Sequence, residues 1–108
     1  MDVGVAIMNL IARKKLEIFI EANALAAVEE MLSQAGFKGW SVFESVEGSG
    51  AHGRWRQTGI GEAPAYLIVT IGNDAAAERA LSWLGDHFKT YPGVAAVTDV
   101  SVMRGERF

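Results

Sequence analysis

The stretch LAAVEEMLSQAGFKGWSVFESV, residues 25–46, carries the signals for a helix, the end of that helix and a following strand. Apolar residues recur three and four positions apart in its first half, which predicts an amphipathic helix; they are Leu25, Val28, Leu32 and Ala35. Gly36 comes next, where helices commonly end on a left-handed residue. Residues 40–46 are rich in β-branched and aromatic types and predict a strand. Asn23 precedes the helix and is its predicted N-cap.

The segments on either side extend this alternation of strands and helices. Residues 15–21 alternate between apolar and polar types and predict a half-buried strand, with Leu16, Ile18 and Ile20 on the buried face. Residues 65–71 are almost continuously apolar, as expected of a well-covered central strand. After a predicted cap at residues 72–74, a second helix has an apolar stripe made of Ala77, Ala80, Leu81, Leu84 and Phe88.

Residues 94–103 predict a last strand, so the order of elements is βαββαβ. This order is typical of the ferredoxin-like α+β fold, a four-stranded antiparallel sheet with two helices on one face. A long loop, about residues 48–63, joins the second and third strands. The sheet face without helices is expected to be partly apolar and to favour oligomers; the residues predicted for it are Phe19, Trp40 and Tyr66.

Composition and charge limit which kinds of protein and binding site this chain can form. The 108 residues suit one domain, and the net charge of −3 argues against a nucleic-acid-binding protein. The absence of cysteine excludes disulfides and thiolate metal sites. Residues 1–12 are read as an N-terminal extension to a single domain at 13–108. The apolar run there is too short to span a bilayer, and its flanking charges do not fit a signal peptide. We therefore expect a cytoplasmic protein with no stable membrane insertion.

The loop contains G-x-G-x-x-G at Gly48, Gly50 and Gly53. A dinucleotide-binding turn needs a helix to open at the third glycine, and the further glycines and the proline that follow make a helix improbable. No Gly-Lys-Ser/Thr follows, which argues against a phosphate-binding loop of the Walker type. Glycine-rich backbone can still form a nest of amides that binds anions. The candidates for that role are Gly50, His52, Gly53 and Arg54, and the alternative is a loop without a bound ligand.

Other functions find less support in the sequence. His52 and His87 are far apart and no third metal ligand accompanies them, so no metal site is predicted. Glu44 and Glu47 lie near each other, but no nucleophile, base and orienting group surround them, so no enzyme is predicted. The third strand lacks the basic and aromatic motif of RNA-binding domains with this topology. A trimer of the same fold with a structural or metal-responsive role stays open as the alternative.

From Lys15 to Arg104 the chain resembles the PII-like signalling proteins. In that family a helix with the pattern L..V...L...G.KG.TV leads into a strand and then to G-x-G at the root of the T-loop. Matches to this pattern occur at Gly36, Lys38, Gly39, Ser41, Gly48 and Gly50. The chain lacks the lysine-containing B-loop before the last strand and has no tyrosine within residues 48–63. These departures make it most similar to the divergent PII-like subgroup associated with carboxysomes and inorganic carbon.

The resemblance implies a homotrimer that binds ADP or AMP at clefts between subunits, with ATP or cyclic AMP as other nucleotides to consider and bicarbonate as a further ligand. It places Gly39, Trp40 and Ser41 beside the adenine and Gly48, Ser49 and Gly50 beside the phosphates. Thr70 would line the cleft, and Arg104 would reach it from the adjacent subunit. Arg54 is expected to meet phosphate charge.

The T-loop, residues 48–63, is expected to report the ligand state to a protein partner, either a transporter or a carboxysome-related protein. Fixing the backbone of one residue costs about 1–2 kcal/mol, whereas a micromolar ligand supplies about 8 kcal/mol. A nucleotide is therefore expected to order the root, Gly48 to about Arg54, and a partner the rest.

Overall fold

The computed structural model describes residues 9–45, 47–50, 53–56 and 65–108. The elements in chain order are β1 (Leu10–Glu21), η1 (Ala22–Ala24), α2 (Leu25–Ala35), β2 (Trp40–Ser45), β3 (Glu47–Gly50), β4 (Gly53–Arg56), β5 (Ala65–Gly72), α3 (Asp74–His87), β6 (Gly93–Met103) and η2 (Gly105–Arg107). None of the helices in these ranges is both long enough and apolar enough to span a membrane.

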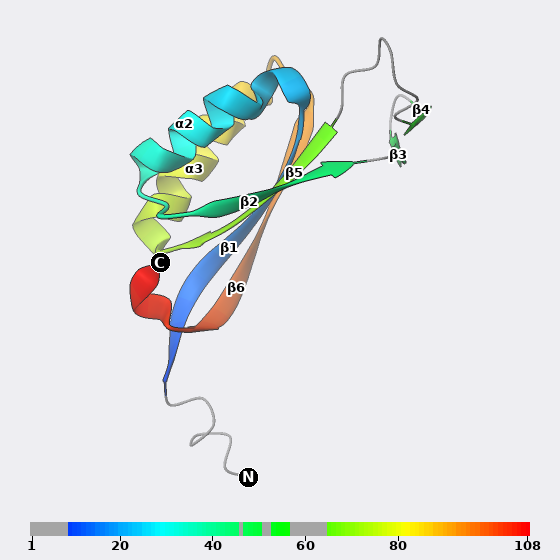
Figure 1. The fold of residues 1–108 in the computed structure, drawn as a ribbon. Helices are drawn as coiled ribbons and strands as arrows, with labels where there is room; N and C mark the ends of the chain where they lie inside the picture. Colours follow the sequence, from blue (N-terminus) through cyan, green and yellow to red (C-terminus); the bar gives the residue numbers. More distant parts are fainter. Residues whose placement is uncertain (1–8, 46, 51–52, 57–64) are drawn as a thin grey trace.

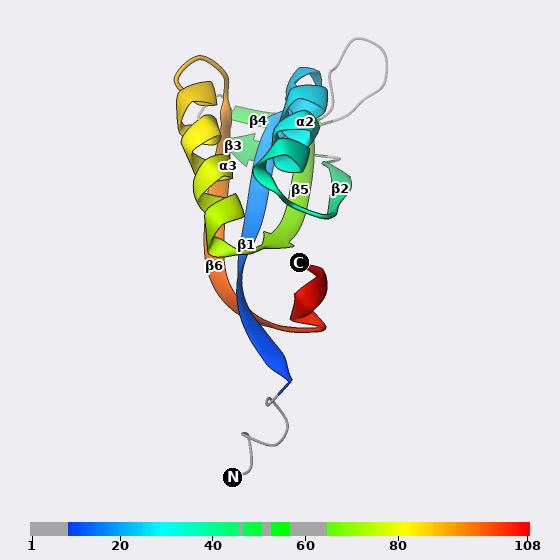
Figure 2. The ribbon, with the colours of Figure 1, turned by 90° about the vertical axis from the view of Figure 1, so that its left-hand side faces the viewer.

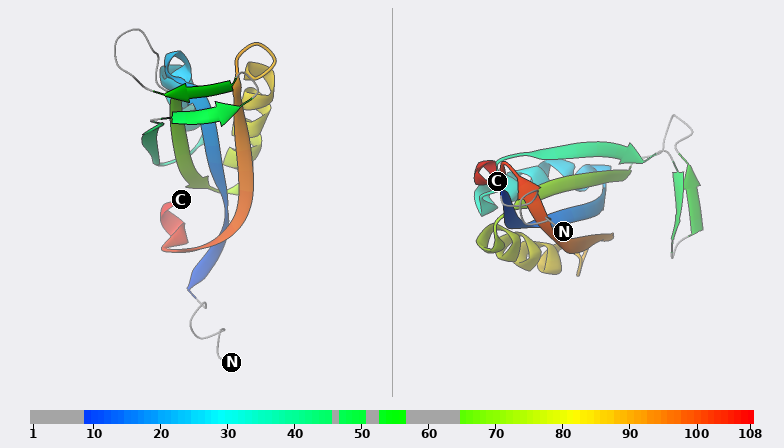
Figure 3. Two further views of the ribbon diagram at one scale, coloured as in Figure 1. Left: turned by 90° about the vertical axis from the view of Figure 1, so that its right-hand side faces the viewer. Right: turned by 90° about the horizontal axis from the view of Figure 1, so that it is seen from below.

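The main sheet is antiparallel throughout and has the strand order β2-β5-β1-β6. Helices α2 and α3 lie side by side on one face of this sheet (Figures 1 and 2). In the described part of the chain no helix covers the other face (Figure 3). The predicted ferredoxin-like α+β fold is confirmed, and the apolar strand β5 occupies a central position beside β1.

The core lies between the sheet and the two helices. Leu16 and Ile18 from β1 are fully buried and pair with Thr70 and Ile68 of β5. Both predicted helix stripes contribute to the same cluster, with Val28, Leu32, Ala35, Ala77, Ala80 and Leu84 all buried. Full burial of a Leu or Ile side chain contributes about 1.5–3 kcal/mol, so this layer supplies most of the driving force for the fold.

The uncovered face of the sheet carries an apolar row that crosses all four strands. Phe43 pairs with Leu67, Leu67 with Phe19, and Phe19 with Val94, and directly paired residues point to the same face. Phe19 is 47% exposed, Phe43 54% and Val94 57%. Phe19 therefore lies on the predicted face, and the row defined by these four residues is called the open-face row below.

The sequence prediction was wrong for the two other aromatic residues assigned to this face. Trp40 and Tyr66 pack against the core on the helix side. Their strand partners explain the difference, because Trp40 pairs with Thr70 and Tyr66 pairs with Ile20, both of which are buried.

Two further predictions differ from the structure at the ends of elements. Strand β1 begins at Leu10, five positions before the predicted start, because β6 continues to pair with it as far as Met103. The division between an extension at 1–12 and a domain at 13–108 stays a prediction, and residues 1–8 lie outside the described residues.

Asn23 does not cap α2: it lies in η1, and the N-cap position is Ala24, which makes no side-chain bond. By contrast, the predicted cap at residues 72–74 is present, since Asn73 Oδ1 accepts from the Ala76 amide at 2.8 Å.

The predicted loop at 48–63 contains secondary structure that the sequence did not reveal. Strands β3 and β4 form a separate two-stranded antiparallel sheet beyond the end of β2 (Figure 1). Backbone hydrogen bonds can hold such a ladder whatever its side chains are. A glycine-rich hairpin can therefore form without the alternation of apolar and polar residues from which strands are predicted. Residues 51–52 and 57–64 of the loop lie outside the described residues.

Candidate functional site

The turn between α2 and β2 fixes the start of the predicted nucleotide site. Gly36 has φ of 110°, and its amide donates to the carbonyls of Leu32 and Ser33, so the predicted left-handed C-cap is confirmed. Arg79 of α3 donates from Nε and Nη2 to the Ala35 carbonyl at 2.9 and 2.6 Å. Phe37 is buried below the turn. The path of the chain into β2 is therefore fixed by the end of α2, by Arg79 of α3 and by the burial of Phe37.

Gly39, Trp40 and Thr70 meet at the first residue of β2. The Thr70 hydroxyl Oγ1 donates to the Gly39 carbonyl at 2.7 Å, and Thr70 is only 2% exposed. Trp40 is half-buried, and its indole Nε1 donates to Oε2 of Glu29 at 2.9 Å. Thr70 thus holds the backbone that precedes the site, and within a single chain its side chain presents little surface to a ligand.

Ser41 is exposed, and β2 is an edge strand of the main sheet. An edge strand offers backbone donors and acceptors along its outer side. A planar ligand with its own donors and acceptors, such as a nucleobase, can bind such an edge while stacking on neighbouring aromatic surface. The start of β2 has both features.

The hairpin of β3 and β4 brings together the residues predicted to bind anions. In its register Ser49 lies opposite Arg54, and Gly50 lies opposite Gly53. Gly48 lies opposite Trp55. Gly50 and Gly53 form the last described pair of this ladder, so two glycine backbones lie opposite each other where the predicted anion site would be. His52, the remaining anion candidate, lies outside the described residues.

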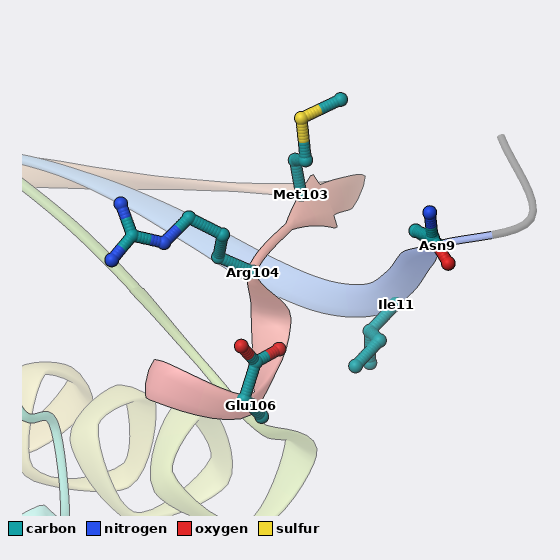
Figure 4. Close-up of a pocket in the computed structure, with 5 residues that line it drawn as sticks. All are labelled: Asn9, Ile11, Met103, Arg104 and Glu106. Carbon is teal, nitrogen blue, oxygen red and sulfur yellow. The ribbon is translucent and has the colours of Figure 1, made fainter. Parts of the chain in front are cut away.

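Arg104 follows the last residue of β6 and has a left-handed backbone, with φ of 62° and ψ of 35°. It lines an open pocket of about 530 Å³ together with Asn9, Ile11, Met103 and Glu106 (Figure 4). The turn η2 and the hairpin lie at opposite ends of the chain's main sheet (Figure 1). One chain therefore does not bring Arg104 to the glycine residues of the hairpin.

No group of three or more His, Asp or Glu side chains with metal-binding geometry occurs among the described residues. The clearest electrostatic feature lies away from the site. A hydrogen bond to Asp99 and the ion pair that accompanies it raise the pKa of the Lys14 ammonium above its ordinary value. This pair links β1 to β6.

Comparison with known proteins decides the family. The sequence model described as nitrogen regulatory protein P-II matches residues 13–107. The chain belongs to the P-II family. No curated protein sequence matches it.

Solved PII-like proteins share the whole architecture of this PII-family chain. CPII from Thiomonas intermedia K12, a PII-like protein bound to ADP, AMP and bicarbonate, is 26% identical with a TM-score of 0.84. The match covers 92% of this chain and 95% of CPII. A putative PII-like signalling protein from Thermus thermophilus is also 26% identical, with a TM-score of 0.80, and the match covers 94% and 99% of the two chains. A DUF3240 family protein from Shewanella baltica OS155, at 12% identity and a TM-score of 0.63, shares the fold. These matches confirm the resemblance to divergent PII-like proteins.

Several residues that shape the candidate site were not predicted from the sequence. Glu29 of α2 accepts a hydrogen bond from the Trp40 indole, and no sequence motif marks it for this role. Arg79 and Arg13 each donate to a backbone carbonyl that is distant in sequence, Ala35 and Phe108 respectively. No local pattern marks such residues, because their partners become neighbours only in the folded chain.

Proposed function

We propose that this chain is a PII-like signal-transduction protein that forms a homotrimer and binds ADP or AMP at the clefts between subunits. Its T-loop reports the ligand state to a protein partner in the control of bicarbonate or other inorganic carbon. The protein acts by binding and not by catalysis. The observation that carries the proposal is the likeness to CPII, which is bound to ADP, AMP and bicarbonate and matches this chain over nearly its whole length.

The adenine is proposed to bind at Gly39, Trp40 and Ser41, against the free edge of β2. Trp40 is half-buried and fixed by Glu29, so part of its ring can take up a base without first losing rotational freedom. Thr70 acts at this cleft through the Gly39 carbonyl that it holds. Aromatic contacts of this kind contribute about 0.5–1.5 kcal/mol beyond the burial of area.

The phosphates are proposed to bind the backbone at Gly48, Ser49 and Gly50, with charge supplied by Arg54 and by Arg104 of the adjacent subunit. A hydrogen bond to a charged group contributes about 1.5–3 kcal/mol. Two such contacts, the hairpin amides and stacking at Trp40 together approach the roughly 8 kcal/mol of a micromolar ligand. Bicarbonate is proposed to use the anion-binding amides of Gly50 and Gly53, with Arg54 and His52 as side-chain donors.

The trimer is supported by two features of the single chain. The open-face row leaves large apolar side chains in water, and such surfaces commonly mark subunit contacts. The three groups of proposed site residues are also separated in one chain, since Gly39 and Trp40 lie at the start of β2, the hairpin lies past its end, and Arg104 lies by η2. A site shared between subunits accounts for this separation.

Isothermal titration calorimetry with AMP, ADP, ATP and cyclic AMP, each with and without bicarbonate, tests the proposal. We expect micromolar binding of ADP or AMP, with bicarbonate changing the measured affinity or heat. Thermal shift supplies a second readout, because a ligand at 1,000 times its Kd stabilises the folded state by about 4.1 kcal/mol. A trimeric preparation that gives no heat and no thermal shift with any adenine nucleotide would overturn the proposal.

A further inference from the structure

The end of the chain folds back onto the beginning of β1. β5 pairs with β1 only from Lys14 onward, whereas β6 pairs with β1 from Leu10. Figure 2 shows β6 on one side of β1 and the η2 turn on the other, beyond the end of β5. The turn therefore occupies the place beside Leu10–Arg13 that β5 leaves free.

Arg13 ties this turn to the strand. Its guanidinium donates from Nε to the Phe108 carbonyl at 3.2 Å and from Nη1 to the Ala12 carbonyl at 2.8 Å. Arg13 and Phe108 are 95 positions apart in sequence. The donors of a guanidinium lie in a rigid plane, so an arginine that binds two carbonyls fixes the position of one relative to the other. A lysine at the same place has a compact ammonium on a flexible stem and does not impose that geometry.

Gly105 seats the turn closely against β1. The residue is buried, and a Cβ at this position would lie 2.6 Å from Cβ of Ile11, a separation that side chains do not reach. Within the turn, the Arg107 amide donates to the Arg104 carbonyl at 3.1 Å and the Phe108 amide to the Gly105 carbonyl at 3.0 Å. Only glycine allows the turn to lie this close to Ile11 of β1.

Arg104 stands immediately before this anchored turn. A left-handed backbone is unfavourable for a residue other than glycine, so the surrounding contacts must hold it. Its side chain makes no hydrogen bond or ion pair with another described residue, and Figure 4 shows the guanidinium pointing away from Glu106. The charge is thus free for a ligand, while the backbone that carries it is fixed from both sides.

We infer that Arg13 and Gly105 are positioning residues that fix the direction of Arg104 toward the phosphate of a nucleotide held by the adjacent subunit. The inference rests on the proposed function, since it assigns Arg104 to that nucleotide. Arg13 and Gly105 do not touch the ligand: they determine where the Arg104 guanidinium is when the ligand arrives, and so lower the ordering that binding requires.

A double-mutant cycle tests this role, because it separates an effect transmitted through Arg104 from a general loss of structure. We expect Arg13→Gln to weaken ADP binding about tenfold in the otherwise unchanged trimer and less than about twofold when Arg104 is already alanine. Gly105→Ala should follow the same pattern. Arg13→Lys, which keeps the charge but not the fork, should fall between Arg13→Gln and the unchanged protein.

Arg107→Gln is the matched control, because it removes one positive charge from the same turn at an exposed side chain, and it should keep the original affinity. Light scattering checks that every variant is still a trimer. A readout without ligand is the ¹³Cα chemical shift of Arg104, which should report a left-handed backbone in the unchanged protein and lose that signature in Arg13→Gln.

Equal loss of ADP affinity from Arg13→Gln in both backgrounds, or no loss in either, would overturn the positioning role and leave the proposed function standing. An unchanged Arg104 shift in Arg13→Gln would also overturn it. If the unchanged trimer does not bind ADP at all, the proposed function fails first and this inference falls with it.

Discussion

The Trp40 indole Nε1 donates a hydrogen bond to Oε2 of Glu29 at 2.9 Å, which links edge strand β2 to helix α2. The two residues are 11 positions apart, and both are partly buried. The bond fixes the rotation of the indole at the point where the chain enters the sheet. The Glu29 carboxylate therefore controls the ring that we propose to contact adenine.

Removing that carboxylate should loosen the indole and lower stability. Hydrogen bonds to charged groups contribute about 1.5–3 kcal/mol. Because this one is partly exposed, we expect Glu29→Ala to lower the free energy of unfolding in urea by about 1 kcal/mol, and Glu29→Gln, which keeps an oxygen acceptor, to lower it less.

Glu30→Ala is the control for that change. Glu30 accepts from Gln34 Nε2 in an exposed pair four positions apart, worth about 0.2–0.5 kcal/mol. Equal losses from Glu29→Ala and Glu30→Ala would mean that the Trp40 bond contributes nothing beyond an ordinary surface contact.

Gly72 and Gly85 should respond in opposite directions to the same substitution. A Cβ at Gly72 would lie 2.6 Å from the ring of Phe37, which is 4% exposed and supports the turn into β2. We expect Gly72→Ala to lower the free energy of unfolding by about 1–3 kcal/mol, as overpacking in cores does. Gly85 lies in α3, and apart from its chain neighbours and the helix backbone no atom of the described residues lies within 4 Å of its Cβ position, so Gly85→Ala should raise stability by about 0.5–1 kcal/mol. Urea denaturation measures both, and a stable Gly72→Ala would show that Phe37 can move without loss.

The open-face row offers a direct test of the proposed homotrimer. Phe43 lies on the edge strand β2, is 54% exposed in the single chain and pairs with Leu67 of the inner strand β5. A carboxylate there would be desolvated by a neighbouring subunit without a partner, which is strongly unfavourable. We expect Phe43→Glu to turn the trimer into monomers in sedimentation analysis and to abolish ADP binding, since the proposed site needs two subunits. Phe43→Leu should keep both properties, and a trimeric Phe43→Glu would exclude the row from the subunit contact.

Local signals were sufficient to predict the fold. Helix spacing from Leu25 to Ala35, the glycine at 36 and the apolar residues of β5 each specify an element without reference to distant partners, and their order selects the ferredoxin-like topology. Strand β2 was less informative, because Trp40 and Val42 alternate with Ser41 and Phe43 and both faces contain an apolar residue. Only its register with β5 shows which face meets the helices.

The candidate site was predictable only where local sequence signals mark it. Gly39 to Ser41 follow the helix and glycine pattern closely in sequence, so their place at the start of β2 could be expected. The contacts that fix them could not, since Thr70 reaches Gly39 across 31 positions and Arg13 reaches Phe108 across 95. Such pairs depend on the tertiary structure, and one sequence contains no local pattern that encodes them.

Hydrogen–deuterium exchange should show that ADP protects the root of the T-loop more than the rest of it. In the hairpin, Ser49 already lies opposite Arg54, so a ligand bound there can stabilise the existing ladder and protect its amides at a small cost in backbone entropy. Ordering further residues costs about 1–2 kcal/mol each, and a micromolar ligand supplies about 8 kcal/mol in total. We therefore expect protection by ADP from Gly48 to about Arg54 and little change over residues 57–63, with the protection reduced in Arg104→Ala. Uniform protection of residues 48–63 by ADP alone would contradict this, because it would mean that the nucleotide orders the whole loop and leaves nothing for a partner to order.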